Sequence, residues 1–192
     1  MSIEWLNLRS WNGSQNTALE ELCCQLARYE QVPPDSTFIR KAPPDAGVEC
    51  FWKLPSGDEW GWQAKFFLSP PGANQWSQLD DSIRKALEKH PRLTSYTICL
   101  PIDRQDPRID KQQWFMDKWN EHVEKWQGWT KEKNMSVELN YWGEHEIWER
   151  LSLEEHRGRH SSGLTRNYLA SNGSRIVLRK QLQMLVHATY LN

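Results

Sequence analysis

The sequence has no apolar run close to the roughly 20 residues that a helix needs to cross a bilayer. It also has no marked excess of charge of either sign, because 24 Lys and Arg residues stand against 25 Asp and Glu residues, for a net charge of −1. This balance excludes a generally basic surface for nucleic acid, although not a local basic face. Residues 1–11 contain no basic stretch followed by an apolar one, so no secretory signal is expected. We therefore expect no membrane partner and a cytoplasmic location.

Cysteine is scarce, with four residues in the chain and no C-x-x-C spacing among them. Cys23 and Cys24 are adjacent, whereas Cys50 and Cys99 are isolated. This pattern is typical neither of a zinc site nor of a disulfide framework. We interpret the four residues as reduced and mostly buried thiols, as expected in a cytoplasm.

Acidic residues and tryptophan are both missing from residues 161–192. All 12 tryptophans lie between Trp5 and Trp148. The first 160 residues hold 20 basic and 25 acidic residues and so carry −5, whereas the last 32 residues carry +4. The two parts therefore have different compositions.

The length of 192 residues fits one compact domain plus an appendage, at roughly 150 residues per domain. We predict a domain over residues 1–155 and a tail of different composition over residues 156–192. Two explanations of the tail stay open. One is a shift of the reading frame near Ser161, and the other is a docking helix over residues 177–191.

Hydrophobic periodicity predicts helices that alternate with strands. Apolar residues at helical spacing, with suitable end signals, predict four helices, over residues 16–29, 75–90, 111–126 and 144–151. Aromatic and β-branched runs predict four strands, over residues 48–54, 60–68, 96–101 and 137–142. The first two strands form a hairpin, and the proline-bearing stretch 32–44 is expected to be a loop. This order of elements indicates an α/β sandwich around a mixed sheet.

The hairpin brings together the side chains best suited to chemistry. Successive side chains of a strand point to opposite faces, which puts Glu49 on the same face of the hairpin as Gln63 and Lys65. With the turn centred on Gly57, Glu49 lies opposite Lys65. The same register puts Phe51 opposite Gln63. A carboxylate, a carboxamide and an ammonium group therefore share one face of an otherwise apolar hairpin.

This trio suits the hydrolysis of a phosphodiester. Oxygens of Glu49 and Gln63 can bind a hard divalent cation, Mg²⁺ or Mn²⁺, which would activate water and stabilise the charge of the transition state. Lys65 can orient that water or neutralise the phosphate. A second carboxylate from the first helix, Glu20 or Glu21, would complete the metal shell. The alternative is a plain cross-strand ion pair between Glu49 and Lys65.

Three motifs resemble those of the PD-(D/E)xK nucleases. The segments Gly47-Val-Glu49 and Trp62-Gln-Ala-Lys65 resemble the motif pair of the Mrr-like branch, whose second motif is Q-x-K. The segment Leu19-Glu-Glu-Leu22 is similar to the F-E-x-L signature of that branch, which implies that Glu20 is the helix carboxylate. Glu49 stands where the broader family usually has Asp. Asp45, in the preceding turn, is an accessory candidate.

Roughly residues 5–160 resemble the N-terminal nuclease domain of large bacterial antiviral STAND-type NTPases. The most similar segments are EWGWQAK, QWSQ and DKWN, at residues 59–65, 75–78 and 117–120. The resemblance implies a restriction-endonuclease-like α/β/α sandwich with a central mixed sheet. It also implies an Mg²⁺-dependent endonuclease for double-stranded DNA, which acts as an anti-phage effector. The candidate partners, besides DNA, are an NTPase or sensor module outside this chain and further copies of the chain.

Two other functions stay open at the level of sequence. A catalytically inactive nuclease fold would bind DNA or a partner protein without cleavage. A carbohydrate- or peptide-binding module would expose several tryptophans on one face. Trp60 and Trp76, beside loops near the hairpin, are candidates for contact with a partner. Trp119 and Trp126 lie at helical spacing and are expected in the core.

Overall fold

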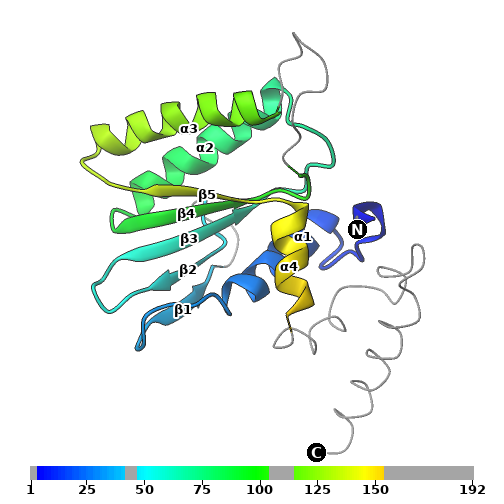
Figure 1. Cartoon of the computed structure of the whole chain (residues 1–192), viewed down its shortest axis with the longest axis horizontal. Coiled ribbons are helices and arrows are strands. Elements are labelled where there is room, and N and C mark those ends of the chain that lie inside the picture. The colour runs from blue at the N-terminus through cyan, green and yellow to red at the C-terminus, as the bar shows by residue number, and fades with distance from the viewer. Residues whose placement is uncertain (1–3, 42–46, 104–114, 154–192) are drawn as a thin grey trace, which may run out of the picture.

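The fold is built on one mixed sheet with helices on both of its faces (Figure 1). The structure, a computed structural model, describes residues 4–41, 47–103 and 115–153. Asp45 and the predicted tail over residues 156–192 lie outside the described residues, as does the proposed domain boundary at residue 155. The α/β class and the mixed sheet that the sequence predicts are confirmed.

The sheet has five strands in the order β1-β2-β3-β4-β5. Their bounds are Thr37–Arg40, Cys50–Lys53, Glu59–Ala64, Leu93–Cys99 and Glu138–Trp142. Neighbours among β1, β2 and β3 are antiparallel, whereas β3, β4 and β5 are parallel. The carboxyl ends of the three parallel strands therefore meet at one edge of the sheet, and β2 begins at that same edge.

Two pairs of helices enclose the sheet (Figure 1). The four helices are α1 (Gln15–Ala27), α2 (Ala73–Lys89), α3 (Phe115–Glu132) and α4 (Glu144–Ser152). A short 3-10 helix, Trp5–Asn7, precedes them. Helices α2 and α3 connect parallel strands and cover one face, while α1 and α4 pack on the other. Among the described helices, none is both long and apolar enough to cross a membrane.

Local sequence signals explain where the helices begin and end. The hydroxyl of Ser14 caps α1 by accepting a hydrogen bond from the Thr17 N–H at 3.1 Å. At the start of α2, the side-chain oxygen of Gln75 accepts a hydrogen bond from the Gly72 N–H at 2.8 Å. The other end of α2 lies just before Pro91, since a residue that precedes proline is disfavoured in the helical conformation.

Strand β1 corrects the predicted loop over residues 32–44. Residues 37–40 pair with β2, and Phe38 lies opposite Trp52 with their ring centroids 5.2 Å apart. The sequence Thr-Phe-Ile-Arg does not alternate between apolar and polar residues, which is the pattern by which a half-buried strand is recognised. The prolines on either side of β1 indicated a loop, but none lies within the strand, and β1 occupies an edge of the sheet.

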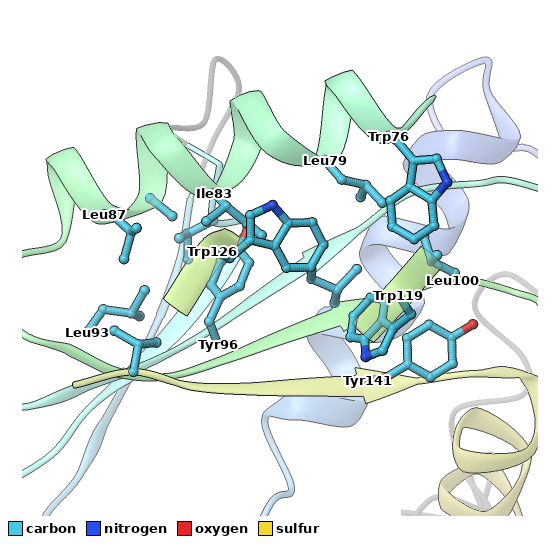
Figure 2. Close-up of a cluster of buried hydrophobic side chains, with 14 of the residues drawn as sticks. Trp76, Leu79, Ile83, Leu87, Leu93, Tyr96, Leu100, Trp119, Trp126 and Tyr141 are labelled. Atoms are coloured by element: carbon cyan, nitrogen blue, oxygen red, sulfur yellow. The ribbon is translucent and has the colours of Figure 1, made fainter. Parts of the chain in front are cut away.

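The core between the sheet and helices α2 and α3 is dominated by large aromatic side chains (Figure 2). Trp126 is completely buried and Trp119 is 6% exposed, which confirms their predicted place in the core. Trp76 is also only 6% exposed and stacks on His122, with a centroid separation of 4.2 Å. The prediction that Trp76 contacts a partner is therefore wrong, because α3 covers its ring.

A buried carboxylate joins α2 to α3. Asp80 accepts hydrogen bonds from Nε1 of Trp126 at 2.7 Å and from Nζ of Lys125 at 2.6 Å, and Nδ1 of His122 lies 3.0 Å from it. Burial alone would raise the pKa of Asp80, but hydrogen bonds from Lys125, Trp126 and His122 outweigh this effect and lower it. Ionised Asp80 therefore stabilises the folded state.

We expect Asp80→Asn to reduce the free energy of unfolding by about 1–3 kcal/mol, because charge-assisted hydrogen bonds are lost in a buried site. The matched control is Asp81→Asn, which alters an exposed neighbour whose contact with Arg84 is 3.8 Å long. A lowered pKa means that the contribution of Asp80 is complete above the ordinary aspartate pKa of about 3.9. Denaturant unfolding should show the difference between wild type and Asp80→Asn vanish as the pH falls through the lowered pKa. An equal effect of both substitutions would contradict this role.

Candidate functional site

Two of the predicted site residues, Glu49 and Gln63, meet at the edge where β2 begins and β3 ends. One residue before β2, the Glu49 N–H donates to the carbonyl of Trp62 at 2.9 Å, and Trp62 is the residue that pairs with Cys50. The Gln63 side chain donates through Nε2 to Oε1 of Glu49 at 2.5 Å. Glu49 is 3% and Gln63 1% exposed. The structure therefore places a carboxylate and a carboxamide in direct, buried contact.

The register of the hairpin differs from the predicted one by two residues. Phe51 lies opposite Gly61 rather than Gln63. This register is two residues away from the one that would set Glu49 opposite Lys65, so the predicted opposition of Glu49 and Lys65 is wrong. Gln63 and Lys65 are two residues apart, so alternation along this stretch of chain keeps them on one face. The contact with Gln63 brings Glu49 to this segment, and the sharing of one face by all three residues stays a prediction.

The turn of the hairpin explains the shift. The Gly57 N–H donates to the Leu54 carbonyl at 2.8 Å, and the Leu54 N–H donates to the Asp58 carbonyl at 2.8 Å. Gly57 has a φ of +83°, the left-handed conformation that glycine adopts readily. A three-residue loop whose last residue is left-handed is a common hairpin connection. It centres the hairpin on Ser56 instead of Gly57.

Lys65 follows β3 on the same face as Gln63. Its backbone N–H donates to the Cys99 carbonyl at 3.0 Å, which continues the pairing of β3 with β4 beyond Ala64. The residue is only partly buried. The Lys65 side chain therefore leaves the sheet on the face of Gln63, and its ammonium group can extend toward solvent.

The segment that carries Glu49 is fixed by Gly47 and Tyr96. The Tyr96 hydroxyl of β4 donates to the Gly47 carbonyl at 2.6 Å. Gly47 has a φ of +77°, and a Cβ at this position would overlap the Ser82 carbonyl of α2. Glycine is thus required by both conformation and space. Sequence analysis included Gly47 in a motif but missed Tyr96, since a tyrosine within an apolar strand gives no signal of contact with a site.

Glu20 lies on α1, which packs on the face of the sheet that carries Cys50, Trp62 and Ala64. The role of Glu20 as a metal ligand stays a prediction. The alternative carboxylate, that of Glu21, forms an ion pair with Arg40 at 3.2 Å.

The four cysteines belong to the core between α1 and the sheet and are all buried, two of them on α1 and two on strands. The pKa of Cys24 is raised far above its ordinary value, mainly by a hydrogen bond with the Cys50 thiol and, to a smaller extent, by burial. The nearby charge of Arg40 opposes this rise. The pKa of Cys99 is likewise raised, mainly by burial and next by a hydrogen bond with Cys23. Cys24 and Cys99 therefore pack as neutral thiols, and the predicted burial of all four cysteines is confirmed.

The donor chemistry of the pair fits a hard cation. Carboxylate and carboxamide oxygens suit Mg²⁺ or Mn²⁺ rather than a soft metal. The described part of the chain contains no group of three or more His, Cys, Asp or Glu side chains that could hold a metal ion. A cation at Glu49 and Gln63 would therefore also need backbone carbonyls, water or substrate oxygens, ligands that Mg²⁺ commonly accepts.

The tryptophans do not form an open binding face in the described part of the chain. Trp11 is the one tryptophan there that is exposed, at 42%. Trp60, a predicted contact residue, is only partly buried but packs against the core under α1. A carbohydrate- or peptide-binding function based on several exposed indoles is thus not supported by the described residues.

No protein-family model matches the sequence, and no curated protein matches it either.

We expect Gly47→Ala to lower the free energy of unfolding by about 1–3 kcal/mol more than Gly13→Ala, because of the clash with the α2 backbone. Gly13 is a matched control, since its φ is +84° and a Cβ there would meet nothing within 4 Å. Both substitutions strain a left-handed residue, but only the first also displaces α2. Chemical denaturation of both variants tests this difference, and equal losses of stability would contradict the close packing of Gly47.

Proposed function

We propose that this chain is a metal-dependent endonuclease domain of the PD-(D/E)xK type, which hydrolyses phosphodiester bonds of double-stranded DNA. The observation that carries the proposal is the contact between Glu49 and Gln63 at 2.5 Å, with Lys65 two residues beyond Gln63 on the same face. A nuclease of this type needs an acidic residue and a Q-x-K segment on adjacent strands. Strands β2 and β3 are adjacent and antiparallel, which supports the proposal.

The proposed roles follow from the chemistry of each group. Glu49 and Gln63 would hold the cation through oxygen, with Glu20 as a further ligand. Mg²⁺ or Mn²⁺, when bound, supplies Lewis-acid activation of water and stabilises negative charge. Lys65 holds a positive charge at the accessible end of this face, where it would neutralise the phosphate or orient water. The near-neutral net charge of −1 means that DNA would be held by local contacts rather than by a general basic surface.

The biological setting rests on the sequence resemblance alone. In antiviral NTPases of the STAND type, such a domain acts as the effector of a sensor. We propose the same place for this chain, with an NTPase or sensor module as partner and self-association of the nuclease domains as the means of activation. Cleavage of double-stranded DNA would then follow detection of phage.

One observation favours a second candidate, a catalytically inactive nuclease fold that binds DNA or a partner protein. Glu49 and Gln63 are almost completely buried, and the Gln63 amide donates a hydrogen bond to one carboxylate oxygen of Glu49. A pair that is permanently closed in this way would serve stability rather than catalysis. Cleavage assays separate the two candidates.

We expect the purified protein to nick supercoiled plasmid in Mg²⁺ and to lose this activity in excess chelator. Glu49→Ala and Lys65→Ala should each lower the rate at least about 100-fold, since the first removes a ligand of the cation and the second removes a positive charge beside the phosphate. Lys53→Ala is the matched control, because Lys53 is an exposed lysine at the opposite end of β2. It should retain the wild-type rate.

Equal nicking by wild type and both site variants would indicate a contaminant or another site and would contradict the proposal. Binding of DNA without cleavage by a folded wild-type protein would instead support the inactive nuclease fold.

A further inference from the structure

We propose that Tyr96 is a positioning residue, which stabilises the orientation of the Gln63 carboxamide that presents its oxygen to a cation. The inference rests on the proposed function, because it assumes that Gln63 and Glu49 hold a metal ion. Tyr96 lies in β4, and its ring rises from the sheet toward α2 (Figure 2). It is 1% exposed, as is Gln63, so the two groups must satisfy their hydrogen bonds inside the protein.

The tyrosine hydroxyl has one proton to donate, and the structure shows where it goes. The Tyr96 oxygen lies 2.6 Å from the Gly47 carbonyl and 3.5 Å from Oε1 of Gln63. A backbone carbonyl can only accept a hydrogen bond, and 2.6 Å is a short hydrogen-bond distance whereas 3.5 Å lies beyond the usual range for two oxygens. The proton therefore belongs to the Tyr96–Gly47 hydrogen bond. The hydroxyl oxygen can still accept a hydrogen bond from Gln63.

The carboxamide of Gln63 has two orientations, which a cation distinguishes. In the structure its nitrogen donates to Glu49 at 2.5 Å, and its oxygen faces the hydroxyl oxygen of Tyr96. Reversal of the amide would place the oxygen toward Glu49 and the nitrogen toward Tyr96. The nitrogen can donate to Tyr96 once the present separation of 3.5 Å shortens to hydrogen-bond range. Two oxygens so close repel each other unless a cation lies between them. Cation binding at Glu49 and a hydrogen bond from Gln63 to Tyr96 would therefore occur together.

This coupling explains how Gln63 can be a metal ligand although, without metal, its amide nitrogen is hydrogen-bonded to Glu49. When no cation is present, the amide nitrogen donates a hydrogen bond to one oxygen, Oε1, of the buried carboxylate. When a cation is bound, the same nitrogen finds its partner in Tyr96 instead of losing a hydrogen bond. Tyr96 thus offsets the cost of turning Gln63 toward the metal, while its bond to Gly47 holds the segment that leads to Glu49.

The test is the affinity for Mn²⁺ alone, measured by isothermal titration calorimetry on the full chain. Tyr96→Phe keeps the buried ring and removes the hydroxyl. We expect the dissociation constant to rise about three- to tenfold, which corresponds to one neutral hydrogen bond. Denaturant unfolding of the metal-free variants records separately the loss of stability from the Tyr96–Gly47 bond.

A second background separates positioning from a general structural effect. In Gln63→Glu the side chain presents an oxygen in either orientation, so it needs no partner to turn it. Tyr96→Phe should then leave the dissociation constant for Mn²⁺ unchanged. A structural effect would weaken binding by the same factor in both backgrounds, and that result would overturn the inference.

The side-chain amide of Gln63 gives an independent readout that needs no variant at position 96. Its ¹⁵N–¹H resonances should shift when diamagnetic Mg²⁺ is added to the wild-type protein, because the nitrogen exchanges a carboxylate partner for a hydroxyl. Binding of Mg²⁺ with unmoved Gln63 resonances would overturn the inference but leave the proposed function standing. Absence of any cation binding by the wild-type protein would overturn the metal site itself and the inference with it.

Discussion

The site depends on which groups compensate the buried carboxylate of Glu49. Glu49 is 3% exposed, and the burial of an ionised carboxylate costs several kcal/mol unless hydrogen bonds or an opposite charge compensate. The Gln63 amide provides a hydrogen bond to one oxygen of this carboxylate. A divalent cation would compensate more strongly, and the same two side chains offer it oxygen donors. The pair is therefore suited to two states, one closed by a hydrogen bond and one bridged by metal.

The fold brings this pair together through backbone constraints rather than through side-chain packing. The hairpin turn at Gly57 sets the register of β2 against β3, and this register decides that Glu49 meets Gln63. Gly47 allows the chain to pass close to α2, and Tyr96 holds its carbonyl. Three different elements, β3, β4 and α2, thus fix one short segment before β2. A site assembled in this way is sensitive to changes that lie outside it.

The sequence predicts much of this architecture because most of its elements are long and strongly patterned. The amphipathic helices α1 and α2 were expected within two residues of their observed ends. Strand β1 escaped prediction because it has only four residues between proline-bearing segments. The nearness of Glu49 and Gln63 could be predicted, since it survives an error of two residues in register.

Long-range contacts could not be predicted in this way. The Tyr96 hydroxyl and the Gly47 carbonyl are 49 residues apart in sequence, and nothing local to either residue reports their contact. The same holds for Asp80 of α2, because no local sequence signal indicates its hydrogen bond with Trp126 of α3. Composition also gave little warning that Trp76 would be buried against His122. Sequence patterns therefore indicate which residues share a face but not which groups satisfy one another inside the core.

The most direct test of the central idea is a crystal structure of the protein soaked in Mn²⁺, with anomalous diffraction used to locate the ion. The account predicts an anomalous peak in contact with carboxylate oxygen of Glu49 and with the carboxamide oxygen of Gln63, with the Gln63 nitrogen turned toward Tyr96. A Glu49–Gln63 hydrogen bond that persists unchanged at saturating Mn²⁺, with no peak beside it, would contradict the account.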